Sequence, residues 1–345
     1  MKDIKSLYLE ELTEEIVRLG EPKFRAKQLY EWMHVHLASD YEAMKNIPGS
    51  LKVKLNDNFA YAKAKLVRVQ ESQIDGTRKY LFAFDNESLV ESVFMRYKHG
   101  NSVCISSQVG CRMGCSFCAS TLDGLKRNLD ASEMLEQIYA IERDTGEKIS
   151  NIVVMGTGEP LDNYDNLVRF VRLISNENGR NISQRNITVS TCGLVENIKR
   201  LAKEDLKITL AISLHAPTDG KRKKLMPVAN RYSIDEIIEA CEMYFDNTGR
   251  RISFEYALVS GENDGVDDAE KLSEIAGRLN CHINLIPVNP IKERDYKRSG
   301  KDAILRFKNK LEKNGINVTI RRELGSDIDG ACGQLRRRQM TESVD

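Results

Sequence analysis

The sequence predicts an α/β protein with a largely parallel sheet, preceded by a smaller segment that is first helical and then rich in strands. Two observations carry this prediction. From about residue 131 to residue 320, short apolar strand patterns alternate with amphipathic helix patterns, as in folds whose helices cover a parallel sheet. Glycine-rich and polar stretches follow several of these strands, at the edge of the sheet where such folds bind their ligands.

The first 60 or so residues look helical. After Glu21 and Pro22, four apolar residues recur at the spacing of an amphipathic helix, namely Ala26, Leu29, Tyr30 and Met33. Basic residues in this stretch could contact RNA, but a solvated charged helix face is the commoner meaning, and we favour it locally.

Residues 61 to 98 change to short strand-like runs separated by the turn formers Asp75-Gly76 and Asp85-Asn86. This pattern predicts an antiparallel meander that leads into a cysteine-rich loop. Glu91 interrupts the last apolar run, and the alternation of a strand would allow it to point out of the sheet.

The alternating region begins with a helix at 131–144, for which Asp130 and Glu133 form a capping pair, and a buried strand follows at 151–155. Further strands are predicted at 187–190, 208–213, 252–257, 282–286 and 318–320. Further helices are predicted at 164–175, 194–203, 234–246, 267–279 and 301–313.

Composition narrows the class of protein. Lys and Arg number 52 against 51 Asp and Glu, so a nucleic acid would have to be held by local basic patches rather than by net charge. No apolar run approaches the roughly 18 residues of a membrane helix, and no signal peptide is evident, so we expect a cytoplasmic protein without membrane contact. Its eight cysteines then favour metal binding or catalysis over a disulfide framework.

The cysteine-rich loop at residues 104–118 carries the strongest chemical signal. Cys111, Cys115 and Cys118 have CxxxCxxC spacing, which supplies three thiolates where closed iron–sulfur and zinc sites use four ligands. The spacing is typical of the radical SAM superfamily, whose [4Fe-4S] cluster uses its open iron to bind S-adenosylmethionine (SAM) and cleave it.

A structural zinc site with Cys104 as its fourth ligand is the alternative. Known zinc patterns favour paired CxxC knuckles or Cys/His pairs, and the sequence has no second knuckle. The spacing therefore favours the cluster.

Polar residues at the predicted strand ends are candidates for binding a cofactor. Glu159 could receive the ammonium group of an amino-acid cofactor, and Gly158 would let the backbone approach it, although the pair alone could be an ordinary tight turn. His215 alone would more often be a hydrogen-bonded interior histidine. Together, residues at several strand ends could line a pocket for ribose, adenine and carboxylate groups: Ser190, Ser213, Leu214, His215 and Asn289.

Two features lie outside this set. Cys332, between Gly330 and Gly333, sits in a polar loop that suits a nucleophile better than a core cysteine, unless the segment is only a disordered tail. Cys192, Cys241 and Cys281 look like apolar fillers instead.

Four basic clusters, mostly placed on loops, predict a phosphate-binding rim: Lys221–Lys224, Lys292–Arg298, Arg321–Arg322 and Arg336–Arg338.

Over nearly its whole length the chain resembles the RlmN/Cfr family of radical SAM RNA methyltransferases. The resemblance rests on ordered motifs at 90–93, 104–111, 111–118, 158–160, 213–217, 284–289 and 327–335. It implies a partial, TIM-like (βα)6 radical SAM barrel with a small N-terminal α+β accessory domain. We place that accessory domain, with RNA contact, at 1–96, the core barrel at 97–330, and a catalytic-cysteine loop with a basic tail at 331–345.

Val109 and Pro160 resemble the RlmN branch, whereas Cfr-like chains tend to carry Cys and Ala there and methylate C8. The RlmN branch implies methylation of adenosine C2 in 23S ribosomal RNA and 3′ of the anticodon in tRNA. A Cfr-like C8 activity, or a zinc-stabilised RNA-binding module, remains the alternative. Gly330 and Cys192 depart slightly from the family pattern.

The resemblance also implies roles for individual residues. Cys111, Cys115 and Cys118 would hold the cluster. One SAM would methylate Cys332, and a second would be cleaved to activate that methyl group. Glu91 would remove the C2 proton, and Cys104 would attack Cys332 to release the product, which leaves a disulfide. We expect a monomer that receives electrons from a flavodoxin or ferredoxin.

Overall fold

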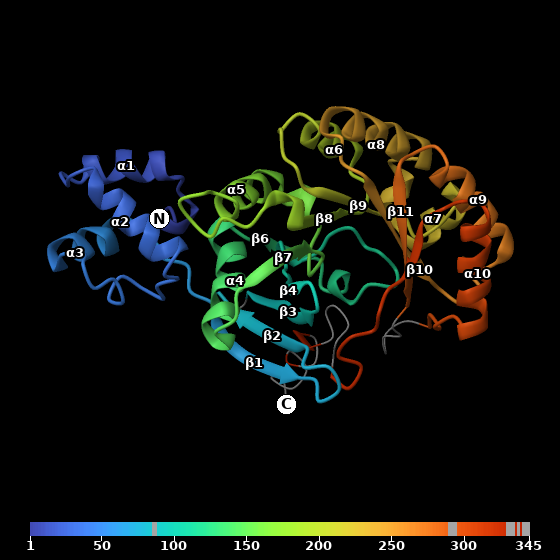
Figure 1. Ribbon diagram of the computed structural model, residues 1–345, viewed down its shortest axis with the longest axis horizontal. Coiled ribbons are helices and arrows are strands. Elements are labelled where there is room, and N and C mark those ends of the chain that lie inside the picture. Colours follow the sequence, from blue (N-terminus) through green and yellow to red (C-terminus); the bar gives the residue numbers. More distant parts are fainter. Residues whose placement is uncertain (85–87, 289–294, 329–334, 337–338, 340–345) are drawn as a thin grey trace.

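The computed structural model describes residues 1–84, 88–288, 295–328, 335, 336 and 339. A single ten-stranded sheet organises the chain, in the order β1-β2-β3-β4-β7-β8-β9-β10-β11-β12 (Figure 1). The strands are β1 (Lys65–Glu71), β2 (Arg78–Ala83), β3 (Leu89–Tyr97), β4 (Gly100–Cys104), β7 (Ile149–Val154), β8 (Ile187–Thr191), β9 (Thr209–Ser213), β10 (Ile252–Leu258), β11 (Cys281–Pro287) and β12 (Val318–Ile320).

From β4 to β12 the neighbouring strands are parallel, and helices cover the outside of the curved sheet (Figure 1). The described strands include no pairing between β12 and β1, so the barrel is open. The predicted partial barrel is therefore confirmed. Its covering helices are α4 (Ala131–Thr145), α5 (Tyr164–Ile174), α6 (Val195–Leu201), α8 (Ile234–Thr248), α9 (Val266–Ala276) and α10 (Lys301–Lys313).

The predicted elements occur in the predicted order, because their apolar spacing matches the faces they bury. The capping pair of α4 is present, with the Glu133 carboxylate accepting from the Asp130 amide at 2.8 Å. The predicted meander is also present, since β1, β2 and β3 pair antiparallel. It continues through β4 into the parallel strands, so the boundary placed at residue 96 falls inside one continuous sheet. The division into domains stays a prediction.

The helical N-terminal segment lies at one end of the molecule, beside α4 and α5 (Figure 1). It contains α1 (Leu9–Arg18), α2 (Phe24–His34) and α3 (Gly49–Asn58), and all four residues of the predicted apolar stripe are buried in α2. The prediction of a helical start is confirmed.

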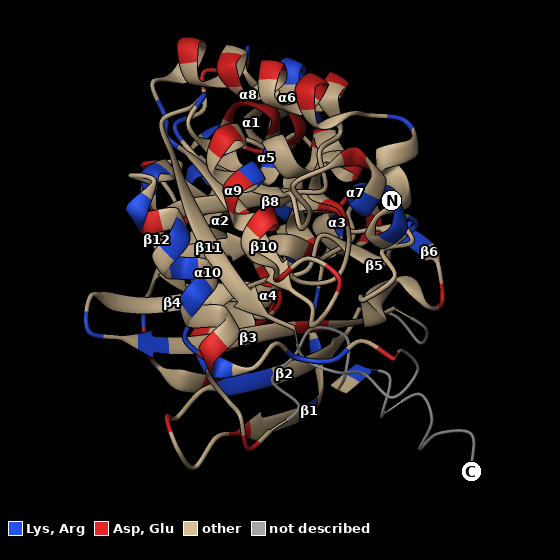
Figure 2. Ribbon diagram, turned by 90° about the vertical axis from the view of Figure 1, so that its right-hand side faces the viewer, with Lys and Arg blue, Asp and Glu red and all other residues tan. Residues whose placement is uncertain are grey.

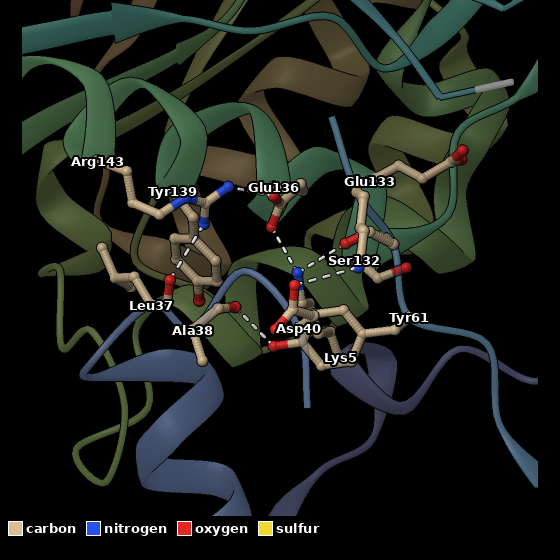
Figure 3. A network of polar contacts seen from close by, with 12 residues as sticks. Lys5, Leu37, Ala38, Asp40, Tyr61, Ser132, Glu133, Glu136, Tyr139 and Arg143 are labelled. Atoms are coloured by element: carbon tan, nitrogen blue, oxygen red, sulfur yellow. Dashed lines mark hydrogen bonds and ion pairs between the residues drawn. The ribbon is translucent and has the colours of Figure 1, made fainter. Parts of the chain in front are cut away.

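Buried charges join this segment to the barrel (Figure 3). The Lys5 ammonium lies 2.5 Å from the Glu136 carboxylate of α4, and both side chains are almost fully buried. Arg143 donates to the same carboxylate and to the carbonyl of Leu37. Because a buried charge without a partner is costly, this network fixes how the helical segment sits on α4.

Two predictions about local structure are wrong. Cys104 is the last residue of strand β4, not part of a loop, and a short hairpin of β5 (Gln108–Gly110) and β6 (Leu125–Asn128) follows it. The basic cluster at Lys221–Lys224 was expected on a loop but lies in helix α7 (Asp219–Leu225), which Thr218 caps. Helical periodicity turns Arg222 into the protein, so it cannot contact RNA phosphate.

The remaining charges are spread over the surface without one dominant sign. In Figure 2, acidic residues run along α8, while Lys and Arg lie on β1 and β2 at the other end of the view. This distribution matches the net charge of +1. Across the residues that the structure describes, no helix combines the length and the apolar character needed to cross a membrane.

Candidate active site

One cavity of about 640 Å³ opens at the carboxyl ends of the parallel strands. The cysteine loop forms one side of it, which we call the cysteine wall (residues 111–118). Strands β3 and β4 form another side, which we call the meander wall. The cavity brings together ten of the residues predicted from the sequence: Glu91, Cys104, Cys111, Cys115, Cys118, Gly158, Glu159, Ser190, Ser213 and His215. Leu214 does not line it. Asn289 and Cys332 lie outside the described residues.

The hairpin β5-β6 positions the cysteine wall. Gly110 has φ +78°, and a Cβ there would lie 1.9 Å from the Gly124 carbonyl oxygen, so only glycine allows this close turn. The amide of Cys111 then donates to that same carbonyl at 2.9 Å. Further along, the Ser116 amide donates to the carbonyl of Leu225 at 2.9 Å, which ties the loop to α7.

Burial raises the pKa of all three thiols of the cysteine wall, to about 12 for Cys111. Cys118 also raises the pKa of Cys111 and Cys115, because these thiols are close enough to repel one another when charged. The three are therefore protonated at neutral pH, and a bound metal must displace their protons.

The arrangement of these thiols bears on whether a cluster or a zinc ion would bind here. Among the described residues, no three His, Cys, Asp or Glu side chains gather closely enough to hold a single metal ion. An iron–sulfur cubane does not need such a gathering, since each thiolate binds a different iron. The three thiols line one wall of the cavity, which is compatible with a [4Fe-4S] cluster held by three thiolates.

Glu159 lies beside the thiols. Its two carboxylate oxygens accept from the amides of Leu161 at 3.0 Å and Cys192 at 2.7 Å, while burial raises its pKa. Gly158 has φ +112°, and a Cβ there would lie 2.6 Å from the Cβ of Gln108. The glycine thus lets this turn pack against β5, which is a close approach that the sequence did not reveal.

His215 follows β9 with φ +56°, a conformation that non-glycine residues adopt rarely and often at functional sites. Its Nδ1 accepts from the amide of Ala257 at 2.9 Å, and burial lowers its pKa to about 3. The ring is therefore neutral, with its hydrogen on Nε2, which makes Nε2 a donor. Nearby, the hydroxyls of Ser190 and Ser213 lie 3.2 Å apart.

The meander wall holds Glu91 and Cys104. Glu91 does not point out to solvent, because its carboxylate lies 3.1 Å from the Lys79 ammonium and both side chains are at most 2% exposed. Glu91 pairs with Leu81 in the register of β2 and β3, so Lys79 is its diagonal neighbour on the same face. Cys104 sits opposite Val93, and burial raises its pKa.

Sequence reasoning missed three buried charges near or in this site: Lys79, Arg222 and Glu255. Lys79 could have been noticed, because it alternates with Leu81 and Ala83 along β2. Glu255, which accepts from the Asn284 side chain at 2.8 Å, stands in a similar strand pattern. The burial of Arg222 could not be recognised from the sequence, because its neighbours in the sequence are lysines.

The described residues on either side of Cys332 are anchored to the meander. The Asp327 carboxylate accepts from the Ser72 hydroxyl at 2.6 Å. The Arg336 amide donates to Glu91 at 2.6 Å, and its guanidinium lies 3.2 Å from a carboxylate oxygen of Asp123. The seven described cysteines are free thiols, so a disulfide is not part of the described structure.

Comparisons with known proteins agree with this geometry. Residues 105–273 match the Radical SAM superfamily, and residues 2–60 match the ribosomal RNA large subunit methyltransferase N-terminal domain. A relative from Lachnospira eligens, described as a probable dual-specificity RNA methyltransferase RlmN, is 61% identical over 345 residues and covers 100% of this chain and 98% of the relative. One from Clostridium novyi with the same description is 52% identical over 337 residues, covering 98% of both chains.

A solved structure agrees as well. The crystal structure of a radical SAM methyltransferase from Sphaerobacter thermophilus matches with a TM-score of 0.93 and 43% identity, covering 97% of this chain and 99% of that chain. The N-terminal helices, the meander and the barrel are all included in a match of that extent.

Proposed function

The chain belongs to the RlmN family of radical SAM RNA methyltransferases, and from this premise we propose that it methylates C2 of adenosine in two RNAs. The first is 23S ribosomal RNA, in the peptidyl transferase centre, and the second is tRNA, at the adenosine 3′ of the anticodon. The observation that carries the proposal is the 61% identity, over all 345 residues, to a relative described as dual-specificity. Val109 and Pro160 support C2 over C8.

As a radical SAM enzyme, the protein uses a [4Fe-4S] cluster and SAM. We assign the cluster to Cys111, Cys115 and Cys118; when bound, the cluster and SAM would supply an electron and a carbon-centred radical. The buried carboxylate of Glu159 and the Nε2 donor of neutral His215 support a place for SAM beside them. We assign SAM binding to Gly158, Glu159, Ser190, Ser213, Leu214, His215 and Asn289, of which Leu214 and Asn289 rest on the resemblance alone.

We further propose that Cys332 carries the methyl group. Its thiolate would take a methyl group from one SAM, and cleavage of a second SAM would supply the radical that removes a hydrogen atom from that methyl, so that its carbon can bond to C2. Glu91 takes the C2 proton. The one electron left over on the base would pass back to the cluster. The Cys104 thiolate would then attack the Cys332 sulfur, so that the carbon–sulfur bond breaks with its electron pair on the carbon, which takes up a proton to become the methyl group. The methylated base leaves, and the disulfide between Cys104 and Cys332 is reopened by a thiol reductant.

The geometry of the meander wall supports these roles. Glu91 is a carboxylate held by Lys79 on the cavity surface, two residues along β3 from the partner of Cys104. The anchors at Asp327 and Arg336 keep both flanks of residues 329–334 against the meander. The residues proposed as base and attacking thiol share this wall with the anchors of Asp327 and Arg336, which supports the proposal.

The proposed mechanism predicts what replacing each mobile thiol does. Cys104→Ala should accumulate protein crosslinked to RNA, because the Cys332 sulfur stays bonded to the base through the new carbon. The crosslink should survive denaturation and disappear on nuclease treatment. Cys332→Ala should form none. Free methylated RNA from Cys104→Ala at the normal rate would remove Cys104 from the mechanism.

The site of methylation is tested by mass spectrometry of ribosomal RNA and tRNA from cells with and without the gene. Loss of 2-methyladenosine from both RNAs is expected. Loss of 8-methyladenosine instead would assign the chain to C8 chemistry. Iron and sulfide analysis of anaerobically purified protein tests the cluster against zinc.

We also propose a monomer that works in the cytoplasm and receives its electron from a flavodoxin or ferredoxin. The near balance of charge and the lack of an apolar spanning helix in the described chain are compatible with this setting. Size-exclusion chromatography with light scattering tests the monomer, and reduction assays with each purified donor test the electron source.

A further inference from the structure

Arg222 is a completely buried arginine directly behind the cavity. Its Nε donates to the carbonyl of Leu214 at 3.2 Å, and its Nη2 donates to the carbonyl of Cys192 at 2.5 Å. Nη1 is buried and has no hydrogen-bond partner. The two acceptors follow the neighbouring strands β8 and β9, so the guanidinium lies under the floor of the site.

The charge of Arg222 is not balanced within the described part of the chain, where no carboxylate forms an ion pair with it. Asp219, one turn earlier, attracts it only at a distance and accepts from the amide of Ile234. The other groups that attract it are the thiolate forms of Cys115 and Cys192. Because arginine stays charged when buried, such a cation is costly unless something negative is bound nearby.

Close packing at Gly193 and a hydrogen bond to the cysteine loop fix the position of Arg222. Gly193 has φ +97°, and a Cβ at that position would lie 3.3 Å from Nη2 and 2.7 Å from the Cδ1 of Ile237. Leu225, on the same short helix as Arg222, accepts the amide of Ser116 from the cysteine loop. The helix that carries the buried cation is thus bonded directly to the loop that carries the thiols.

We propose that Arg222 is a positioning residue for the iron–sulfur cluster and supplies the positive charge that offsets its thiolates and its added electron. The inference rests on the proposed ligands Cys111, Cys115 and Cys118. When these thiols lose their protons to iron, they leave negative charge in a buried place. Cys115 brings part of that charge close to Arg222, which has no carboxylate partner among the described residues. Reduction adds one more negative charge, which the same cation stabilises.

Two substitutions separate the effect of the Arg222 charge from the effect of its hydrogen bonds. Arg222→Gln removes the charge and keeps a donor, whereas Arg222→Lys keeps the charge and loses the planar fork. Lys223→Gln is the matched control, because it removes one exposed charge from the same helix. Each protein is reconstituted with iron and sulfide under anaerobic conditions, and the midpoint potential of the cluster is measured by an EPR-monitored titration without RNA.

Arg222→Gln should lower the midpoint potential of the cluster by about 59 mV, taking a one-electron couple. At a fixed applied potential, the ratio of reduced to oxidised cluster then falls about tenfold. Arg222→Lys should retain most of the wild-type potential, and Lys223→Gln all of it. Equal potentials in Arg222→Gln and wild type would overturn the inference.

Folding and cluster content separate the other outcomes. If Arg222→Gln folds by circular dichroism but loads little iron, while Arg222→Lys loads normally, the charge is needed for loading and the inference is supported. If both variants fail to fold, Arg222 acts through its carbonyl hydrogen bonds and the inference is wrong. A wild-type protein without a cluster would instead contradict the ligand assignment.

Discussion

The two walls of the cavity differ in how their charges are balanced. On the meander wall, Glu91 forms a buried ion pair with Lys79 of the neighbouring strand β2. On the cysteine wall, the thiols are protonated, and the nearby cation Arg222 lacks a carboxylate partner among the described residues. The charge of Glu91 is therefore balanced within the protein, whereas on the cysteine wall the proposed cluster would supply the negative charge that faces Arg222.

If the proposed ligands are right, only the cysteine wall should depend on metal. Removing either partner of a buried ion pair destabilises the fold, because the remaining charge is left buried without a partner. Protonated thiols are neutral and leave no buried charge without a partner. We therefore expect the cysteine loop to fold without iron. We expect apo protein to keep the meander wall intact and to vary mainly at the cysteine wall.

The largest expected effect is the loss of the cluster when a cysteine of the cysteine wall is replaced, compared with its retention when Cys104 of the meander wall is replaced. Cys115→Ala should abolish the cluster, while Cys104→Ala on the meander wall should retain it. Cys241→Ala is the matched control, because Cys241 is fully buried in α8 and does not line the cavity. Iron and sulfide per protein are the measurement, and loss of iron in Cys104→Ala would make Cys104 a fourth ligand.

The next effect tests the ion pair that completes the meander wall. Lys79→Met should destabilise the apo protein by roughly 3–5 kcal/mol, because it leaves the buried Glu91 carboxylate without its cation. Adding Glu91→Gln should recover part of the loss. Lys63→Met, which breaks an exposed pair with Asp40, should cost less than about 1 kcal/mol. Urea unfolding compares them, and equal costs would mean that the pair does not hold the wall.

The two walls were also unequally predictable from sequence. CxxxCxxC spacing identifies three thiols of the cysteine wall because the ligands are close in sequence. The diagonal pairing of Lys79 with Glu91 depends on the register of a hairpin whose connection contains residues 85–87, and sequence alone does not fix that register. The Arg222 side chain is buried by contacts with Leu214 and Cys192, whose positions depend on the assembled sheet.

The fold shows the same limit. Long amphipathic patterns such as that of α10 identified every long covering helix, because their apolar spacing is set by the face they bury. Helix α7 escaped detection because its seven residues include Gly220 and four basic residues, so propensity and charge both suggested a loop. One contact that anchors this helix is the hydrogen bond from the Ser116 hydroxyl to the carbonyl of Leu225, across 109 residues of chain.

A smaller effect concerns proton release at the cysteine wall. The pKa of Cys111 rises from 9.0 to about 12 in the folded apo protein, so above pH 9 the unfolded chain loses a proton that the folded chain keeps. Its contribution to stability is present below pH 9 and falls as pH rises, by up to about 1.4 kcal/mol per pH unit.

Comparing wild type with Cys111→Ala between pH 8 and 10 isolates this contribution. The stability advantage of the wild-type apo protein should shrink with rising pH. Cluster-loaded protein should not show this slope, because its thiols are already deprotonated. A pH-independent difference in the apo protein would indicate that the Cys111 thiol is not protonated as we infer.

The smallest effect asks which side of the cavity the RNA phosphates approach. Of the predicted basic clusters, Arg321 and Arg322 are exposed and line the cavity, a few residues before Asp327, which is bonded to Ser72 of the meander. Replacing both with Gln should weaken RNA binding and reduce its salt dependence by up to about one slope unit per lost phosphate contact. The double change Lys223→Gln and Lys224→Gln removes as much exposed charge from α7, on the side of the cysteine wall. If the α7 variant loses slope and the Arg321 and Arg322 variant does not, the RNA backbone lies over the cysteine wall, and the meander wall receives only the base.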